Sequence, residues 1–249
     1  LIQIILWLSL VLPLVVESHP VYKELLPVDC EDIFTNGSKH SGVYTIFPAG
    51  RDSPVQVWCD MGCDENDSHT DGKWTVIQRR MDGTVNFYRP WDQYKKGFGN
   101  VDGEYWLGLE SIFMLTWRGK YELKIDMEDF EKGQVFARYS SFSIDPESDK
   151  YRLHVSGYID GGAGDSLSHH NGRDFATFDR DYGNCAKSYE GGFWFSSSCV
   201  RANPNGLYKW GSGVSSYSGV QWYSWKGSSY SLKTMVMKIR RVSLDEFEK

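Results

Sequence analysis

Three consecutive segments with a two-residue period constrain the fold of this chain more than any other feature of its sequence. The apolar positions of the first segment are Tyr121, Leu123, Ile125 and Met127, and charged residues stand between them. The same alternation continues at Val135, Ala137 and Tyr139 and then at Tyr151, Leu153 and Val155. Successive side chains of a strand point to opposite faces, and short turns can join only antiparallel neighbours. The pattern therefore predicts an antiparallel sheet with one face in the core and the other in water.

Additional strands are predicted at residues 43–47, 55–59, 73–80 and 231–242, which turn residues separate from their neighbours. Two short helices are predicted at residues 90–96 and 109–117, because Gly97 and Gly119 stand where helices commonly stop. Between residues 157 and 219 no period is visible, although aromatic side chains persist among Gly, Ser, Asn and Asp. A long irregular segment inside a compact domain usually has a function. The expected fold class is therefore α+β, with an antiparallel sheet, short helices and an irregular lobe.

The first 16 residues are almost wholly apolar, and this run is shorter than the roughly 20 residues that a membrane-spanning helix needs. We interpret residues 1–18 as a secretory signal peptide, with a signal anchor as the alternative. Residues 19–27 then form a short leader, residues 28–243 one domain and residues 244–249 a tail. No other apolar run approaches membrane length. We therefore expect a secreted, extracellular protein that does not insert into membranes once the signal is removed.

Secretion changes the meaning of the five cysteines, because disulfides form and persist outside the cell. Two local bridges, Cys30–Cys59 and Cys185–Cys199, would leave Cys63 over, but the sequence alone allows other pairings. Cys63 could bridge two chains, remain a free thiol, or join Cys59 and His69 in a metal site if Cys59 were unpaired. An odd cysteine on a polar loop favours the interchain bridge and hence a homo-oligomer.

Two Asn-x-Ser sequons, at Asn36 and Asn66, are typical of a secreted glycoprotein. The net charge of −6 and the absence of a basic stripe in the sequence argue against nucleic acid as a partner. The sequence contains neither a Gly-x-Ser-x-Gly elbow nor a His-Glu-x-x-His motif, so we interpret His169 and His170 as loop residues. We therefore expect a protein that is not an enzyme.

Several ordered motifs carry a family resemblance. They are Cys-Glu-Asp-Ile at 30–33, Gly-Glu-Tyr-Trp-Leu-Gly-Leu at 103–109, Gly-Gly-Ala-Gly-Asp-Ser-Leu at 161–167 and Asn-Pro-Asn-Gly at 203–206. Residues 28–243 resemble the fibrinogen-related (fibrinogen C-terminal) domains shared by fibrinogen chains, ficolins and microfibril-associated proteins. The short leader and Phe-Asp-Arg-Asp at 178–181 resemble the microfibril-associated members most. The resemblance implies a twisted antiparallel sheet, an irregular calcium- and ligand-binding lobe, and the disulfides Cys30–Cys59 and Cys185–Cys199.

The resemblance also implies a calcium site. Asp179 and Asp181 are hard oxygen donors at alternating positions, and the carbonyls of Gly183 and Cys185 could complete the ligand set. The loop between Asp181 and Cys185 is several residues shorter than in the family, so we expect calcium to bind more weakly than is usual there. The alternative is a solvated acidic turn in which a carboxylate caps a helix.

A ligand pocket is the second implied site. Tyr189, Trp194 and Tyr217 match aromatic positions near the family's pocket for acetyl groups, and Asn203 and Asn205 supply polar edges. Val200 stands where the family carries His directly after the second loop cysteine, which removes a donor and weakens the expectation of acetyl recognition. The alternative is that these rings hold the irregular lobe together, the commoner role of buried aromatic side chains.

Two functions follow as hypotheses. The first is a secreted, non-enzymatic extracellular-matrix glycoprotein, associated with microfibrils or elastic fibres, that binds matrix proteins or glycans and gains strength by oligomerisation. The second is a ficolin-like innate-immune lectin that recognises acetylated sugars in a calcium-dependent way. The shortened loop and Val200 favour the first hypothesis over the second.

Overall fold

The computed structural model describes residues 26–62, 72–181 and 183–242 of the chain. The predicted signal peptide, most of the leader, the tail, Cys63 and Asn66 lie outside these residues. None of the described helices is long and apolar enough to cross a membrane.

An antiparallel sheet forms the centre of the described chain, as predicted, and its main path has the order β1-β2-β3-β13-β6-β7-β8. Its strands are β1 (Gly42–Ile46), β2 (Val55–Asp60), β3 (Trp74–Arg80), β6 (Tyr121–Glu128), β7 (Gln134–Ile144), β8 (Leu153–Gly161) and β13 (Thr234–Arg241). Two short strands, β4 (Phe98–Gly99) and β5 (Tyr105–Trp106), attach beside β3. The late strand β13 lies between β3 and β6 and pairs with both.

The three segments with a two-residue period form β6, β7 and part of β8, and β6 shows why the period is so clear. Its residues Leu123, Ile125 and Met127 are buried, whereas Lys124 and Asp126 on the other face are partly exposed. The predicted one-sided burial is therefore present in this strand.

Helices cover the sheet and connect its strands. The predicted helices are α2 (Trp91–Lys96) and α3 (Leu109–Trp117), and both are confirmed. The sequence analysis missed α1 (Cys30–Thr35), although Asp29 caps it by accepting the N–H groups of Glu31 and Asp32. The disulfide Cys30–Cys59 links α1 to β2, as the resemblance implied.

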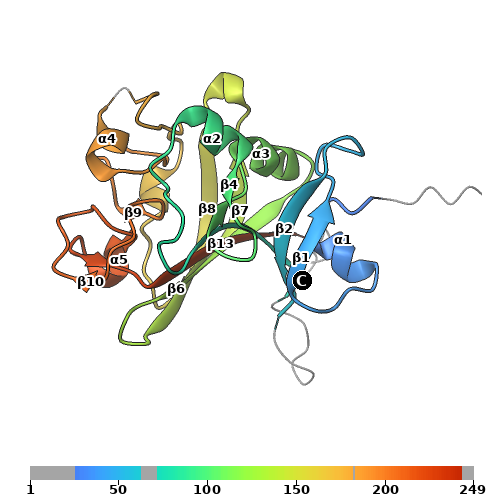
Figure 1. Ribbon diagram of the computed structural model, residues 1–249, viewed down its shortest axis with the longest axis horizontal. Helices are drawn as coiled ribbons and strands as arrows, with labels where there is room; N and C mark the ends of the chain where they lie inside the picture. Colours follow the sequence, from blue (N-terminus) through green and yellow to red (C-terminus); the bar gives the residue numbers. More distant parts are fainter. Residues whose placement is uncertain (1–25, 63–71, 182, 243–249) are drawn as a thin grey trace, which may run out of the picture.

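Residues 163–181 and 183–233 form an irregular lobe at the end of the sheet opposite β1 and β2 (Figure 1). It contains α4 (Cys185–Tyr189), α5 (Tyr223–Lys226) and the 3-10 turn η2 (Ser168–His170), and η1 (Glu147–Asp149) lies just before β8. Two small antiparallel sheets pair β9 (Ala202–Asn203) with β11 (Gln221–Trp222) and β10 (Gly211–Ser212) with β12 (Tyr230–Ser231).

A chain of buried rings joins the lobe to the rest of the core. Trp106 of β5 lies 5.9 Å from Phe175 and 6.3 Å from Trp194, measured between ring centroids. Tyr94 of α2 lies 5.2 Å from Phe175. Each such aromatic pair contributes about 0.5–1.5 kcal/mol beyond the area it buries. The lobe thus shares one hydrophobic core with the sheet and is not a separate domain.

Candidate functional site

A buried arginine on β3 anchors the part of the lobe that carries the predicted site. The guanidinium of Arg80 donates hydrogen bonds to the carbonyls of Pro204 (3.0 Å) and Gly206 (2.6 Å). Burial lowers the pKa of Arg80, and the nearby carboxylate of Glu104 opposes this shift, with Nε and Oε1 3.5 Å apart. Gln78, also on β3, donates to the same Pro204 carbonyl. The sheet therefore fixes the position of residues 203–206.

Glu104 is itself completely buried and is held by main-chain donors. Its carboxylate accepts the N–H groups of Met81, Asp82, Gly83 and Val85, at 2.8–3.2 Å. Burying an ionised carboxylate is costly unless it is paired and hydrogen-bonded, and Glu104 meets both conditions.

His170 fixes a second part of the lobe. One ring nitrogen, Nδ1, lies 2.7 Å from the carbonyl of Trp194, and Nε2 accepts the N–H groups of Arg201 and Ala202, both at 3.1 Å. Nε2 can accept two donors only when it carries no proton, so the ring is neutral and Nδ1–H is the donor. Burial lowers the pKa of His170 to about 4, and the neighbouring His169 and Arg173 add to the effect.

Three tyrosines of the lobe form a cluster that we call the tyrosine ridge: Tyr189 and Tyr217, which are partly exposed, and Tyr223, which is exposed. The rings of Tyr189 and Tyr217 lie 6.0 Å apart, edge to face, and Tyr217 stacks on Tyr223 at 6.1 Å. The guanidinium of Arg201 lies 4.5 Å from the centre of the Tyr223 ring. Tyr and Arg are enriched at protein interfaces, so the arrangement suits a binding surface.

The structure assigns different roles to the five predicted ligand residues. It brings Tyr189 and Tyr217 together as expected. Asn203 is fully buried and acts indirectly: its Nδ2 donates to the carbonyls of both tyrosines, each at 3.0 Å. Val200 is also buried, 3% exposed, and offers no polar edge.

Trp194, which the sequence analysis assigned to the ligand pocket, lies in the core. Its side chain is completely buried, its indole N–H donates to the carbonyl of Tyr151 (2.7 Å), and its ring packs against Phe175. The sequence analysis also missed Arg201 and Tyr223. The only signal for Arg201 was its place directly after Val200. The only signal for Tyr223 was its place between Trp222 and Trp225.

The two aspartates of the predicted calcium site point to different helices. Asp179 accepts the N–H of Trp91 at the start of α2 (2.9 Å) and the hydroxyl of Thr177 (2.6 Å). Asp181 accepts the N–H groups of Gly183 (3.0 Å), Ala186 (2.7 Å) and Lys187 (3.3 Å), and so caps α4.

Calcium needs six to eight oxygen ligands that converge on one point. Within the described ranges, no group of three or more His, Cys, Asp or Glu side chains could hold a metal ion. In this structure the carboxylates of Asp179 and Asp181 are occupied by backbone N–H groups and a hydroxyl group, as the alternative of helix capping predicts. Calcium binding through Asp179, Asp181, Gly183 and Cys185 therefore stays an untested prediction.

Disulfide and sequon positions complete the set of predicted sites. Cys185 pairs with Cys199, as the resemblance implied, and thereby ties α4 to the β9 segment. Asn36 is exposed at the end of α1, which leaves it accessible to glycosylation. Its occupancy, and the roles of Cys63 and Asn66, remain predictions.

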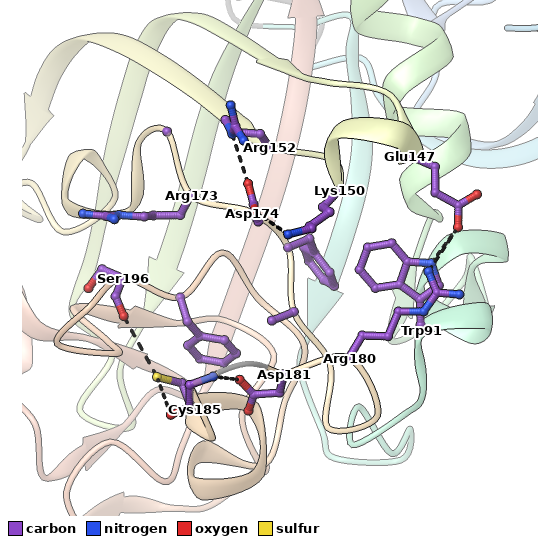
Figure 2. Close-up of a pocket in the computed structure, with 15 residues that line it drawn as sticks. Trp91, Glu147, Lys150, Arg152, Arg173, Asp174, Arg180, Asp181, Cys185 and Ser196 are labelled. Atoms are coloured by element: carbon purple, nitrogen blue, oxygen red, sulfur yellow. Dashed lines mark hydrogen bonds and ion pairs between the residues drawn. The ribbon is translucent and has the colours of Figure 1, made fainter.

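A cavity of about 480 Å³ lies beside α4 and opens between η1, the start of β8 and residues 172–176. Figure 2 shows Asp174 between Lys150 and Arg152 on one wall, and Arg180 beside Trp91 and Glu147 on another. None of the three tyrosines of the ridge lines this cavity.

Comparisons with known proteins agree with this fold and with the lobe at its end. A family model described as "Fibrinogen beta and gamma chains, C-terminal globular domain" matches residues 26–242. The chain is 52% identical over 225 residues to microfibril-associated glycoprotein 4 of Bos taurus, covering 87% of this chain and 86% of the relative. It is 51% identical over 224 residues to the human protein of that name, covering 86% and 85%. The fibrinogen-like globe domain of human ANGPTL2 superimposes with a TM-score of 0.80 at 47% identity, over 86% of this chain and 99% of that domain.

Proposed function

Because this chain belongs to the fibrinogen C-terminal domain family, we propose that it is a secreted, non-enzymatic extracellular-matrix glycoprotein of microfibrils or elastic fibres. It binds matrix proteins or glycans through the tyrosine ridge of its lobe. The observation that carries the proposal is the 52% identity, over most of both chains, to a relative named for its association with microfibrils.

The exposed groups of the ridge support this binding role. Tyr223 is 38% exposed, and Arg201 lies over its ring. Tyr and Arg carry much of the binding energy of protein interfaces, because they combine a large rigid contact area with polar ends. If Cys63 joins two chains, several ridges are linked, and their individually weak contacts add through effective concentration.

The lobe also contains a contact between an exposed histidine and two serines. His169 Nε2 lies 2.8 Å from Ser196 Oγ and 2.9 Å from Ser198 Oγ. In the described part of the chain, no carboxylate bonds to the other nitrogen of His169, so the contact lacks the third member of a Ser-His-Asp triad.

Solid-phase binding of the secreted protein to purified microfibril and elastic-fibre proteins tests the proposal. Tyr223→Ser removes an exposed ring. Tyr217→Asn removes a partly exposed one and keeps a residue that tolerates the φ of 60° at this position. We expect each variant to bind about tenfold more weakly, the loss typical of an interface anchor.

The control is Trp117→Ser on α3, a 73% exposed ring outside the lobe, which we expect to bind like the parent protein. The proposal fails if the parent protein binds none of these matrix proteins. It also fails in its choice of surface if Trp117→Ser weakens binding as much as the ridge variants do.

The edge-to-face pair of Tyr189 and Tyr217 favours the second candidate function, a lectin for acetylated sugars, because these residues match the family's acetyl pocket. Retention on acetylated agarose, reversed by free N-acetylglucosamine and lost in Tyr217→Asn, would support it. Retention that also requires calcium would support the ficolin-like form of this hypothesis.

A further inference from the structure

More cationic than acidic side chains line the cavity beside α4, although the chain as a whole is acidic. Four cationic side chains, Lys150, Arg152, Arg173 and Arg180, line it together with the three acids Glu147, Asp174 and Asp181. The whole chain carries a net charge of −6, so this is a locally cationic hollow in an acidic protein. We propose that it is a second ligand site, separate from the tyrosine ridge, for a saccharide unit with one carboxylate or sulfate group.

The three acids of the cavity are already engaged within the protein. Asp174 pairs with Lys150 (3.3 Å) and with Arg152 (3.0 Å), as Figure 2 shows. Asp181 accepts backbone N–H groups at the start of α4. These acids therefore do not need an external cation.

Glu147 is engaged in the same way. It accepts the indole N–H of Trp91 (2.8 Å), pairs with Lys95, and lies 3.5 Å from a guanidinium nitrogen of Arg180. The guanidinium of Arg180 in turn lies 4.6 Å from the Trp91 ring centre. Glu147 and Arg180 are therefore both held in place before a ligand binds. Binding then loses less side-chain conformational entropy.

Arg173 differs from the other cations of the cavity. It is exposed, and it has no hydrogen bond or ion pair with any side chain in the part of the chain that the structure describes. An anion can therefore bind its guanidinium in the two-point manner that arginine favours, without breaking an existing ion pair.

The other properties of the cavity select the chemical class of the ligand. Its volume of about 480 Å³ lies in the range of small-molecule sites and has room for one or two sugar rings. Phe195 gives a partly exposed apolar wall, whereas Trp91 and Phe175 are each only 2% exposed and offer no open face for a stacked nucleobase. Asp174 and Glu147 retain lone pairs that can accept sugar hydroxyl groups.

These acids also disfavour ligands with several negative charges. A phosphate dianion or a highly sulfated chain would be repelled by the acids that line the same cavity, Asp174 and Glu147 among them. A sugar with a single carboxylate or sulfate ester combines one anion for Arg173 with several hydroxyl donors for the acids. The proposal goes beyond the proposed function, because it uses a different surface and specifies a singly charged saccharide as the ligand.

Titration calorimetry on the secreted protein tests the site with three probes. Glucuronic acid carries one carboxylate, glucose 6-sulfate carries one sulfate, and glucose is neutral. None of the three has the acetyl group on which the second candidate function depends. We expect binding of at least one of the anionic probes and none of the neutral probe at the same concentration. The anion that binds identifies the preferred group.

Two variants and a control make the test specific. Arg173→Ala should weaken binding of the anionic probe roughly tenfold, the loss of one charge-assisted contact, whereas Arg173→Lys should lose less. Arg51→Ala removes an exposed cation from the turn between β1 and β2 and should have no effect. Because Arg173 is exposed, its variants should melt at the temperature of the parent protein.

The proposal is overturned if neither anion binds, if the neutral sugar binds equally, or if Arg51→Ala weakens binding as much as Arg173→Ala does. Its failure can be told apart from failure of the proposed function. Tyr223→Ser should leave binding of the anionic probe unchanged, and Arg173→Ala should leave binding of matrix proteins unchanged.

Discussion

At the scale of single residues, His170 holds three main-chain groups of the lobe at once. Its ring donates to the carbonyl of Trp194 and accepts the N–H groups of Arg201 and Ala202. A protonated ring would lose the acceptor and turn a second N–H toward those two donors. The neutral state of this one ring is therefore a condition for the fold of the segment that enters β9.

The first prediction is a pH dependence of stability that His170 causes. The pKa of His170 is about 4 in the folded protein, below its ordinary value of 6.5. Between pH 6.5 and pH 4 the unfolded chain binds a proton at this histidine and the folded protein does not. The free energy of unfolding therefore keeps its full value above about pH 6.5 and falls by on the order of 3 kcal/mol as the pH drops to 4. Urea unfolding at pH 7 and pH 4.5 measures this loss, and His170→Ala should show a smaller one.

The control for this prediction is His40→Ala, an exposed histidine, which should keep the full pH dependence. The carboxylates of the protein also make the free energy of unfolding depend on pH. The difference between the parent protein and His170→Ala therefore decides the outcome. Equal slopes for the parent protein and His170→Ala would contradict the role of His170.

The second prediction concerns the buried pair Glu104–Arg80. Glu104→Gln keeps the shape of the side chain but leaves the buried Arg80 guanidinium without its counter-charge. We expect a loss of roughly 3–5 kcal/mol in the free energy of unfolding, as for other broken buried pairs. Chemical denaturation measures it.

Glu131→Gln serves as its control, since the Glu131 side chain is 65% exposed and the change should stay within about 0.5 kcal/mol. If Glu104→Gln unfolded like this control, the buried carboxylate would not be needed to hold Arg80 and, through it, residues 203–206.

At the scale of elements, α4 shows how the lobe is held without long secondary structure. Five residues are too few for a helix to be stable alone. Asp181 caps its N-terminus, and the disulfide Cys185–Cys199 fixes its first residue. The carboxylate that the sequence analysis assigned to calcium is thus engaged in keeping this helix in place.

The third prediction follows from this capping role. Asp181→Ala should lower the free energy of unfolding by about 1 kcal/mol, the usual cost of a lost cap. Adding calcium should not raise the melting temperature of the parent protein, whereas a site filled at a hundred times its dissociation constant would contribute about 2.7 kcal/mol. Thermal melts in calcium and in chelator measure both effects.

The control variant is Asp52→Ala, which changes an exposed carboxylate in the turn before β2 and should alter neither quantity. A melting temperature that calcium raises in the parent protein but not in Asp179→Asn or Asp181→Asn would show that the capped loop rearranges around the ion. The sequence-based calcium prediction would then be correct.

The elements also show which parts of the fold a sequence can predict. Strands β6 and β7 and helices α2 and α3 were found because periodic burial and stop glycines are local signals. The lobe has no such signal, because side chain–main chain contacts such as those of Asn203 and His170 hold it. The burial of Trp194 was not predicted for the same reason, since the sequence does not show which face of an irregular segment is buried.

At the scale of the whole molecule, the order of the sheet depends on β13. This strand pairs with β3 on one side and β6 on the other. Lys238 of β13 reaches Asp60 of β2 (2.7 Å) and Asp126 of β6 (2.6 Å), and its side chain is only 6% exposed. The predicted strand at residues 231–242 was found from its composition, but its central place in the sheet depends on contacts distant in sequence.

The fourth prediction tests this dependence. A chain that ends after residue 233 lacks β13, so we expect it to show no cooperative thermal unfolding and to be secreted poorly. Circular dichroism and secretion yield measure the two effects. A chain that ends after residue 242 keeps all residues of the family match and should unfold like the full-length chain. Cooperative unfolding of the shorter chain would mean that β3 and β6 can pair without β13.

The central position of β13 also matters during protein synthesis. A ribosome makes β3 and β6 long before it makes β13, so these strands cannot be joined while most of the chain is being translated. Their edges and apolar faces stay available to other chains and to chaperones until the last part of the domain emerges. The sheet can therefore close only at the end of translation, and a polypeptide released too early is a substrate for degradation and does not become a shortened working protein.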